Sequence, residues 1–210
     1  HVLDLERADV AEELARIVDG RRVLAVLALD VLEHVSRSAP FLAAVRGVIA
    51  PSSAPVILSV PNVGHIDVGA KLLLGRWDVT PTGLLDETHV QFFTEERLEQ
   101  VLGAAGLHRI DHADFELVES DQSFPASHPV LNAGTSIGAA LRALRQQASP
   151  HATVNQFVWA CLAGPQRVHV LDRDDETRPF LSVIVRTQGR RIEELRETLL
   201  SLAAQTVDDF

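Results

Sequence analysis

The chain has 210 residues, of which 46% are hydrophobic, and its formal net charge is −10 at pH 7. This apolar fraction excludes a chain that is disordered throughout, and the negative charge disfavours nucleic acid as a partner because phosphates would be repelled. The single cysteine, Cys161, excludes an internal disulfide framework. With no signal peptide at its start and no apolar run of roughly 18 residues, we expect a cytoplasmic protein without a membrane span.

The first 20 residues predict a short strand followed by a helix. Residues 2–6 read Val-Leu-Asp-Leu-Glu, which is typical of a strand. The apolar residues between Val10 and Val18 then recur at helical spacing. Gly20 is suited to end this helix because glycine readily takes the left-handed conformation.

The centre of the predicted fold is a strand, a helix and a second strand. Val23–Leu29 is a continuous apolar run of strand length, Val56–Val60 is a second one that is apolar apart from Ser59, and Ser36–Ala50 between them has helical spacing. Such runs are typical of parallel strands that are buried on both faces. The unit therefore predicts an α/β fold class.

Polar residues follow both of these strands. Asp30, Glu33 and His34 come after the first strand, and Asn62 and His65 come after the second. In open α/β sheets ligands bind beyond the carboxyl ends of the strands, so we expect a binding site among these five residues.

The rest of the chain continues the alternation of helices and strands. The expected helices are Val68–Gly75, one capped by Thr94 and ended by Gly103, and Ile137–Gln147. The expected strands are His108–Val118 and Val154–Leu162, the second of them antiparallel and at an edge of the sheet.

Three segments together resemble the second half of a class I S-adenosylmethionine-dependent methyltransferase. They are residues 28–35 (Ala-Leu-Asp-Val-Leu-Glu-His-Val), 59–62 (Ser-Val-Pro-Asn) and 85–94 (Leu-Asp-Glu-Thr-His-Val-Gln-Phe-Phe-Thr). The resemblance covers about residues 1–163. It implies a Rossmann-like methyltransferase sheet that is incomplete at the N-terminus, because the family's glycine-rich cofactor turn has no counterpart here.

The resemblance implies S-adenosylmethionine as the cofactor and a set of residues around it. Cofactor-binding candidates are Asp4, Leu29, Asp30 and Asn62. Asp4 falls near the place of the adenine amino group, although a solvated carboxylate explains it equally well.

Candidates for a base that takes a proton from the acceptor are His34, His65 and His89, since imidazoles titrate near neutrality. Asp86 lies three residues before His89 and could pair with it if the segment were a helical turn. For His34 the alternative is an imidazole that caps a helix or bonds a loop carbonyl.

The end of the chain predicts a boundary and a second domain. Residues 164–178 are charged and rich in turn formers, which is typical of a linker. Residues 179–210 resemble the first strand and helix of a family 2 nucleotide-sugar glycosyltransferase. That likeness implies that Val185, Arg186 and Thr187 approach a nucleotide, and it favours a carbohydrate-linked or other small-molecule acceptor for the methyl group.

Other classes of site are disfavoured. No histidines are spaced as ligand pairs on a helix, so the sequence predicts no metal site. A serine hydrolase would need a Gly-x-Ser-x-Gly turn and a dehydrogenase a glycine-rich phosphate turn, and the sequence has neither. Two alternatives to methyl transfer stay open: an accessory region of a glycosyltransferase, and an assembly module that forms a homo-oligomer through an exposed sheet edge.

Overall fold

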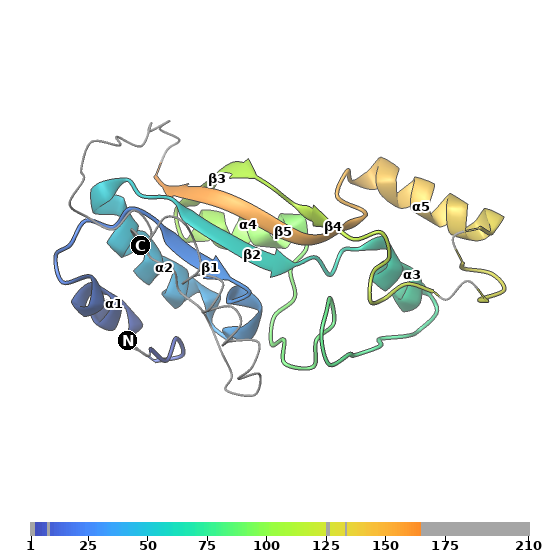
Figure 1. Ribbon diagram of the computed structural model, residues 1–210, viewed down its shortest axis with the longest axis horizontal. Helices are drawn as coiled ribbons and strands as arrows, with labels where there is room; N and C mark the ends of the chain where they lie inside the picture. Colours follow the sequence, from blue (N-terminus) through green and yellow to red (C-terminus); the bar gives the residue numbers. More distant parts are fainter. Residues whose placement is uncertain (1–2, 8, 125–126, 133, 165–210) are drawn as a thin grey trace, which may run out of the picture.

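A five-stranded mixed sheet forms the centre of the computed structural model, which describes residues 3–7, 9–124, 127–132 and 134–164 (Figure 1). The strands run in the order β1 (Val26–Leu29), β2 (Val56–Pro61), β5 (Val154–Ala163) and β3 (Leu107–His112), and β4 (Phe115–Glu116) also pairs with β5. The predicted α/β fold class is confirmed.

The predicted strand-helix-strand unit is present. β1 and β2 are parallel, with Val26 opposite Val56 and Leu29 opposite Ser59, and helix α2 (Ser38–Ile49) connects them. Their carboxyl ends therefore meet at one edge, as expected. β1 has no second partner among the described strands, and the expectation of a homo-oligomer through such an edge stays a prediction.

β5 is antiparallel, as predicted, but it is not an edge strand. It pairs with β2 on one side and with β3 and β4 on the other. Its burial explains the position, since Phe157, Trp159 and Cys161 are all 0% exposed. A strand covered this fully is typical of the interior of a sheet.

The single strand expected over residues 108–118 is broken in two. β3 ends at His112 and β4 begins at Phe115, and Asp114 between them turns its side chain toward β5. Its Oδ1 accepts hydrogen bonds from the Val158 N–H at 3.0 Å and from Trp159 Nε1 at 3.1 Å. The N–H of the buried Trp159 indole therefore finds its hydrogen-bond acceptor in Asp114, at the break between β3 and β4.

The other predicted helices are confirmed, with small shifts at their ends. They are α1 (Val10–Val18), α3 (Ile66–Leu73), α4 (Glu95–Ala104) and α5 (Ser136–Ala148), and two short 3₁₀ helices, η1 (Leu32–His34) and η2 (Ala50–Ser52), complete the set. Thr94 caps α4 by accepting from the Arg97 N–H at 3.2 Å. α3 and α5 lie at the end of the molecule toward which β1 and β2 point (Figure 1).

The main core lies between the sheet and helices α1, α2 and α4. Phe41, Leu42, Val45 and Ile49 of α2 pack in the same buried cluster as the strands, which accounts for the helical spacing in that segment. No helix among the described residues is long and apolar enough to cross a membrane.

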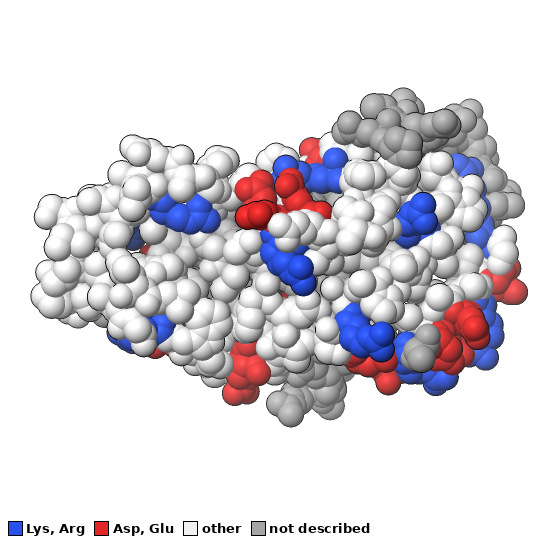
Figure 2. All heavy atoms as spheres, turned by 180° about the vertical axis from the view of Figure 1, so that it is seen from behind, with Lys and Arg blue, Asp and Glu red and all other residues white. Residues whose placement is uncertain are grey.

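Charged side chains are scattered on the face opposite to that of Figure 1. Figure 2 shows acidic side chains gathered near the middle of this face beside Lys or Arg, and mostly uncharged atoms toward the end that holds α3 and α5. Over the described part of this face, Lys and Arg occur in separate groups. The phosphate backbone of a nucleic acid binds to extended basic surfaces, and the residues described on this face do not present one.

The predicted second domain lies outside the described residues. This holds for the linker after Gly164, for residues 179–210 and for the three residues expected to approach a nucleotide. The glycosyltransferase resemblance stays a prediction.

Candidate functional site

A cavity of about 270 Å³ lies at the carboxyl ends of β1 and β2, where the sequence predicted a site. Four carboxylates line it: Asp30, Glu33, Asp86 and Asp121. Among the described residues, no Lys or Arg side chain lines the cavity. A cavity with this lining favours ligands that carry positive charge.

Asp30 is held at the mouth of the cavity by the end of β2 and the start of β5. It has a left-handed backbone, with φ 52°, which turns the chain from β1 into η1. Its N–H donates to Ser59 Oγ at 3.0 Å, and its Oδ1 accepts from Ser59 Oγ at 3.0 Å and from Gln156 Nε2. Although much of the residue is exposed to the cavity, partial desolvation by its walls raises the pKa of the Asp30 carboxyl, and the hydrogen bonds oppose this.

Asp30→Asn is expected to stabilise the protein at pH 7. The raised pKa means that the folded chain binds a proton more tightly than the unfolded chain, so stability falls as pH rises from the ordinary value of 3.8 through the raised pKa, and the loss persists at neutral pH. Asn keeps the acceptor oxygen and tolerates the left-handed conformation. Urea unfolding at several pH values checks this. The extra free energy of unfolding of Asp30→Asn relative to the parent should shrink as pH is lowered toward 3.8. A difference that grows in acid would contradict the raised pKa of Asp30.

Glu33 and His34 come from η1, directly beside Asp30. The Glu33 side chain is 2% exposed, and its carboxylate Oε1 lies 4.0 Å from His34 Nε2. The other ring nitrogen of His34, Nδ1, lies 3.1 Å from the Thr88 carbonyl oxygen. The alternative in which His34 bonds a loop carbonyl is therefore what the structure shows, and the imidazole still lines the cavity.

The loop that carries Asp86 and His89 also reaches the cavity. The loop is not helical, and the Asp86 carboxylate accepts hydrogen bonds from the Thr88 N–H and Oγ1, both at 2.7 Å. The ring of His89 packs edge-on against His34, with centroids 4.9 Å apart. Residues 86–89 nevertheless form a hydrogen-bonded turn, in which the His89 N–H donates to the Asp86 carbonyl at 3.0 Å. The predicted pairing of the Asp86 carboxylate with the His89 imidazole stays a prediction.

His65 does not line the cavity. It is 4% exposed and caps α3, where its Nδ1 accepts from the Asp67 N–H at 3.1 Å. Burial lowers the pKa of His65, and nearby Asp67 only partly opposes this. A neutral imidazole suits the capping position because only the neutral ring has an acceptor nitrogen.

The other predicted cofactor residues also lie away from the cavity lining. Asn62 is 1% exposed, and its amide bonds the carbonyls of His151 and Val154 and the N–H of Gly64. Leu29 ends β1 and is 42% exposed, while the exposed Asp4 accepts from the Glu6 N–H. Their predicted roles stay predictions.

Sequence reasoning missed the contribution of β5 and of Asp121. Asn155 and Gln156 line the cavity from the start of β5, and Gln156 lies opposite Pro61 of β2. Asn155 is 5% exposed, its Oδ1 accepts from the Leu117 N–H at 2.7 Å, and its buried Nδ2 has no hydrogen-bond partner. The sequence feature that could have indicated this contribution is the pair of adjacent amide side chains, Asn155 and Gln156, at the start of an otherwise apolar strand.

Comparisons with known proteins show a weak structural likeness. No protein-family model matches the sequence, and no curated protein matches it. Among solved structures, the chain is similar to a SAM-dependent methyltransferase from Archaeoglobus fulgidus, with 14% identity and a TM-score of 0.41. The match covers 74% of this chain and 66% of that one, just under two thirds of its length.

Proposed function

We propose that the cavity binds S-adenosylmethionine and that the chain is part of a methyltransferase. The acidic lining of the cavity carries this proposal. The cofactor holds a sulfonium cation and a protonated amine, and four carboxylates without a basic side chain among the described lining residues favour such a ligand. The cavity also lies at the end of the strands where α/β sheets bind nucleotides.

The three segments that resemble methyltransferases converge on this cavity. Asp30, Glu33 and His34 come from the first segment, Pro61 from the second, and Asp86 and His89 from the third, and all six line it. The buried Nδ2 of Asn155 adds a donor without a partner beside the cavity. Since an unsatisfied buried donor costs about 1–3 kcal/mol, a ligand oxygen or nitrogen that accepts from it would gain affinity.

The chemistry requires alignment more than covalent help. A nucleophilic atom of the acceptor attacks the methyl carbon, the bond from carbon to sulfur breaks, and its electron pair neutralises the sulfonium. We assign Asp30 to the cofactor, and we assign His34 and His89 to the acceptor side. In the metal-free chain, one of these imidazoles could take the proton that the acceptor loses. The acceptor we propose is a small molecule or a carbohydrate.

Isothermal titration of the chain with S-adenosylmethionine tests the proposal. We expect saturable binding to one site and a loss of affinity of roughly 10-fold or more in Asp30→Asn, because a hydrogen bond to a charged group contributes about 1.5–3 kcal/mol. Replacing His89 should weaken cofactor binding less.

The matched control is Glu12→Gln, which removes one carboxylate from an exposed position on α1. This variant should bind the cofactor like the parent. Absence of saturable binding by the parent, or equal affinities of Asp30→Asn and Glu12→Gln, would overturn the proposal.

A further inference from the structure

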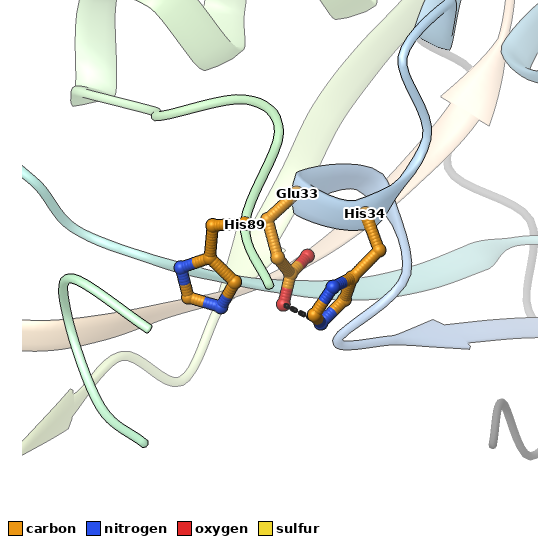
Figure 3. A group of neighbouring side chains, drawn as sticks. All are labelled: Glu33, His34 and His89. Atoms are coloured by element: carbon orange, nitrogen blue, oxygen red, sulfur yellow. Dashed lines mark ion pairs between the residues drawn. The ribbon is translucent and has the colours of Figure 1, made fainter. Parts of the chain in front are cut away.

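We infer that Glu33, His34 and His89 form a binding site for a divalent transition-metal ion in the wall of the cavity. Each side chain offers one ligand atom, and these atoms all lie within 4.8 Å of one another. Figure 3 shows the carboxylate of Glu33 between the two imidazoles. Two imidazole nitrogens and one carboxylate oxygen are a donor set that suits Zn²⁺, Fe²⁺ and Mn²⁺.

The backbone fixes the two segments that supply these ligands against each other. Glu33 and His34 are neighbours in η1, and the Glu33 carbonyl accepts from the N–H groups of Val90 at 2.8 Å and Gln91 at 3.0 Å. These two residues directly follow His89. The loop that carries His89 is therefore tied to the residue that supplies the carboxylate, although 55 positions separate His34 from His89 in the sequence.

The hydrogen bond of His34 sets the tautomer that a metal ligand needs. Nδ1 lies 3.1 Å from the Thr88 carbonyl, which can only accept, so Nδ1 carries the proton. In the neutral tautomer, Nε2 then presents its lone pair on the side of Glu33, whereas in the protonated ring Nε2 pairs with the Glu33 carboxylate at 4.0 Å. Histidines that bind metals commonly donate their other N–H to a carbonyl or carboxylate in this way.

The separation between the ligand atoms also fits a shared ion. Glu33 Oε1 and His34 Nε2 are 4.0 Å apart, which is too far for a direct hydrogen bond. Bonds of about 2.0–2.2 Å place two ligands of one ion at roughly 3–4 Å from each other. A small inward movement of the ligands is enough to close the site.

The surroundings favour a cation at this position. The side chains of Glu33 and His34 are only 2% and 10% exposed, and in such a buried setting a carboxylate attracts a cation more strongly than it would in water. Asp30 and Asp86 line the same cavity, and no Lys or Arg among the described residues does. Three protein ligands would leave a coordination position open toward the cavity, where an oxygen of the acceptor could bind.

The spacing rules behind the sequence prediction of no metal site do not detect this arrangement. Spacing rules look for ligand pairs within one helix or one short motif. Here an adjacent Glu-His pair in a 3₁₀ turn meets a histidine from a distant loop, and only the fold brings them together.

Titration of the metal-stripped chain with Zn²⁺, and separately with Mn²⁺, tests the inference. We expect one saturable site, and we expect His34→Gln and His89→Gln to weaken it by at least about 10- to 100-fold. The matched control is His108→Gln, because His108 is an exposed histidine of β3 away from the cavity. A second control is His112→Gln, since His112, Asp114 and His151 form another cluster.

Two results would overturn the inference: failure of the parent to bind either ion, or binding by His89→Gln that is as tight as that of the parent, whether or not His112→Gln loses it. Thermal unfolding of the metal-free variants should show that each is folded. If His34→Gln fails to fold, His89→Gln decides alone because His89 belongs to a loop. The titrations contain no S-adenosylmethionine, so their outcome is independent of the proposed methyl transfer.

Discussion

Trp159→Ala is expected to lower the free energy of unfolding by about 3–5 kcal/mol, as large-to-small changes of buried aromatic residues do. Trp159 is 0% exposed in the central strand β5. Its ring packs against Phe157, with centroids 5.3 Å apart, and the guanidinium of Arg109 lies 4.3 Å from its centre. Removal of the indole would leave a cavity and deprive the Asp114 carboxylate of a hydrogen-bond donor.

Urea unfolding of Trp159→Ala and of the parent measures this loss of stability. The control is Leu144→Ala, since Leu144 is 65% exposed on α5, and this variant should change stability by no more than about 0.5 kcal/mol. Equal stabilities of the two variants would mean that β5 is not the buried centre of the sheet.

Asn62→Ala is expected to cost about 2–4 kcal/mol of stability. The Asn62 amide donates to the carbonyls of His151 at 3.1 Å and Val154 at 2.9 Å, and its oxygen accepts from the Gly64 N–H at 2.8 Å. These bonds join the end of β2 to the start of β5. Truncation takes a partner from the buried Val154 carbonyl and from the partly buried Gly64 N–H, at about 1–3 kcal/mol for each group that water cannot reach.

Asn132→Ala provides a closely matched control. Asn132 makes the same contact with a glycine two positions later, accepting from the Gly134 N–H at 2.8 Å, but it lies in a partly exposed loop. We expect a cost of about 1 kcal/mol or less there. If Asn62→Ala unfolds like the parent but loses affinity for S-adenosylmethionine, Asn62 acts on the cofactor, as the sequence predicted, and not on the fold.

Most of the order of helices and strands was predictable because burial leaves strong patterns, although residues 3–6, expected to belong to a strand, do not form one. The run that became β1 is continuously apolar, the run that became β2 is apolar apart from Ser59, and the helix between them repeats its apolar residues at helical spacing. The position of β5 inside the sheet was not predictable, since the same apolar alternation suits an edge and a centre. Pairing partners depend on residues far away in the sequence.

The candidate site was predictable in location but not in composition. Residues after parallel strands had to meet at one edge, and Asp30, Glu33 and His34 are found there. Whether a side chain then points into a cavity depends on local bonds. His65 caps α3, and Asn62 bonds the end of β2 to the start of β5. His89 contacts His34 from a loop without regular structure.

The central claim is that the cavity beyond β1 and β2 holds the cofactor, and a crystal structure of the chain with S-adenosylhomocysteine tests it most directly. We predict that the ligand occupies the cavity and contacts Asp30, with Glu33, His34 and His89 beside the place of the departed methyl group. A ligand bound elsewhere on the chain, with this cavity holding only solvent, would contradict the account.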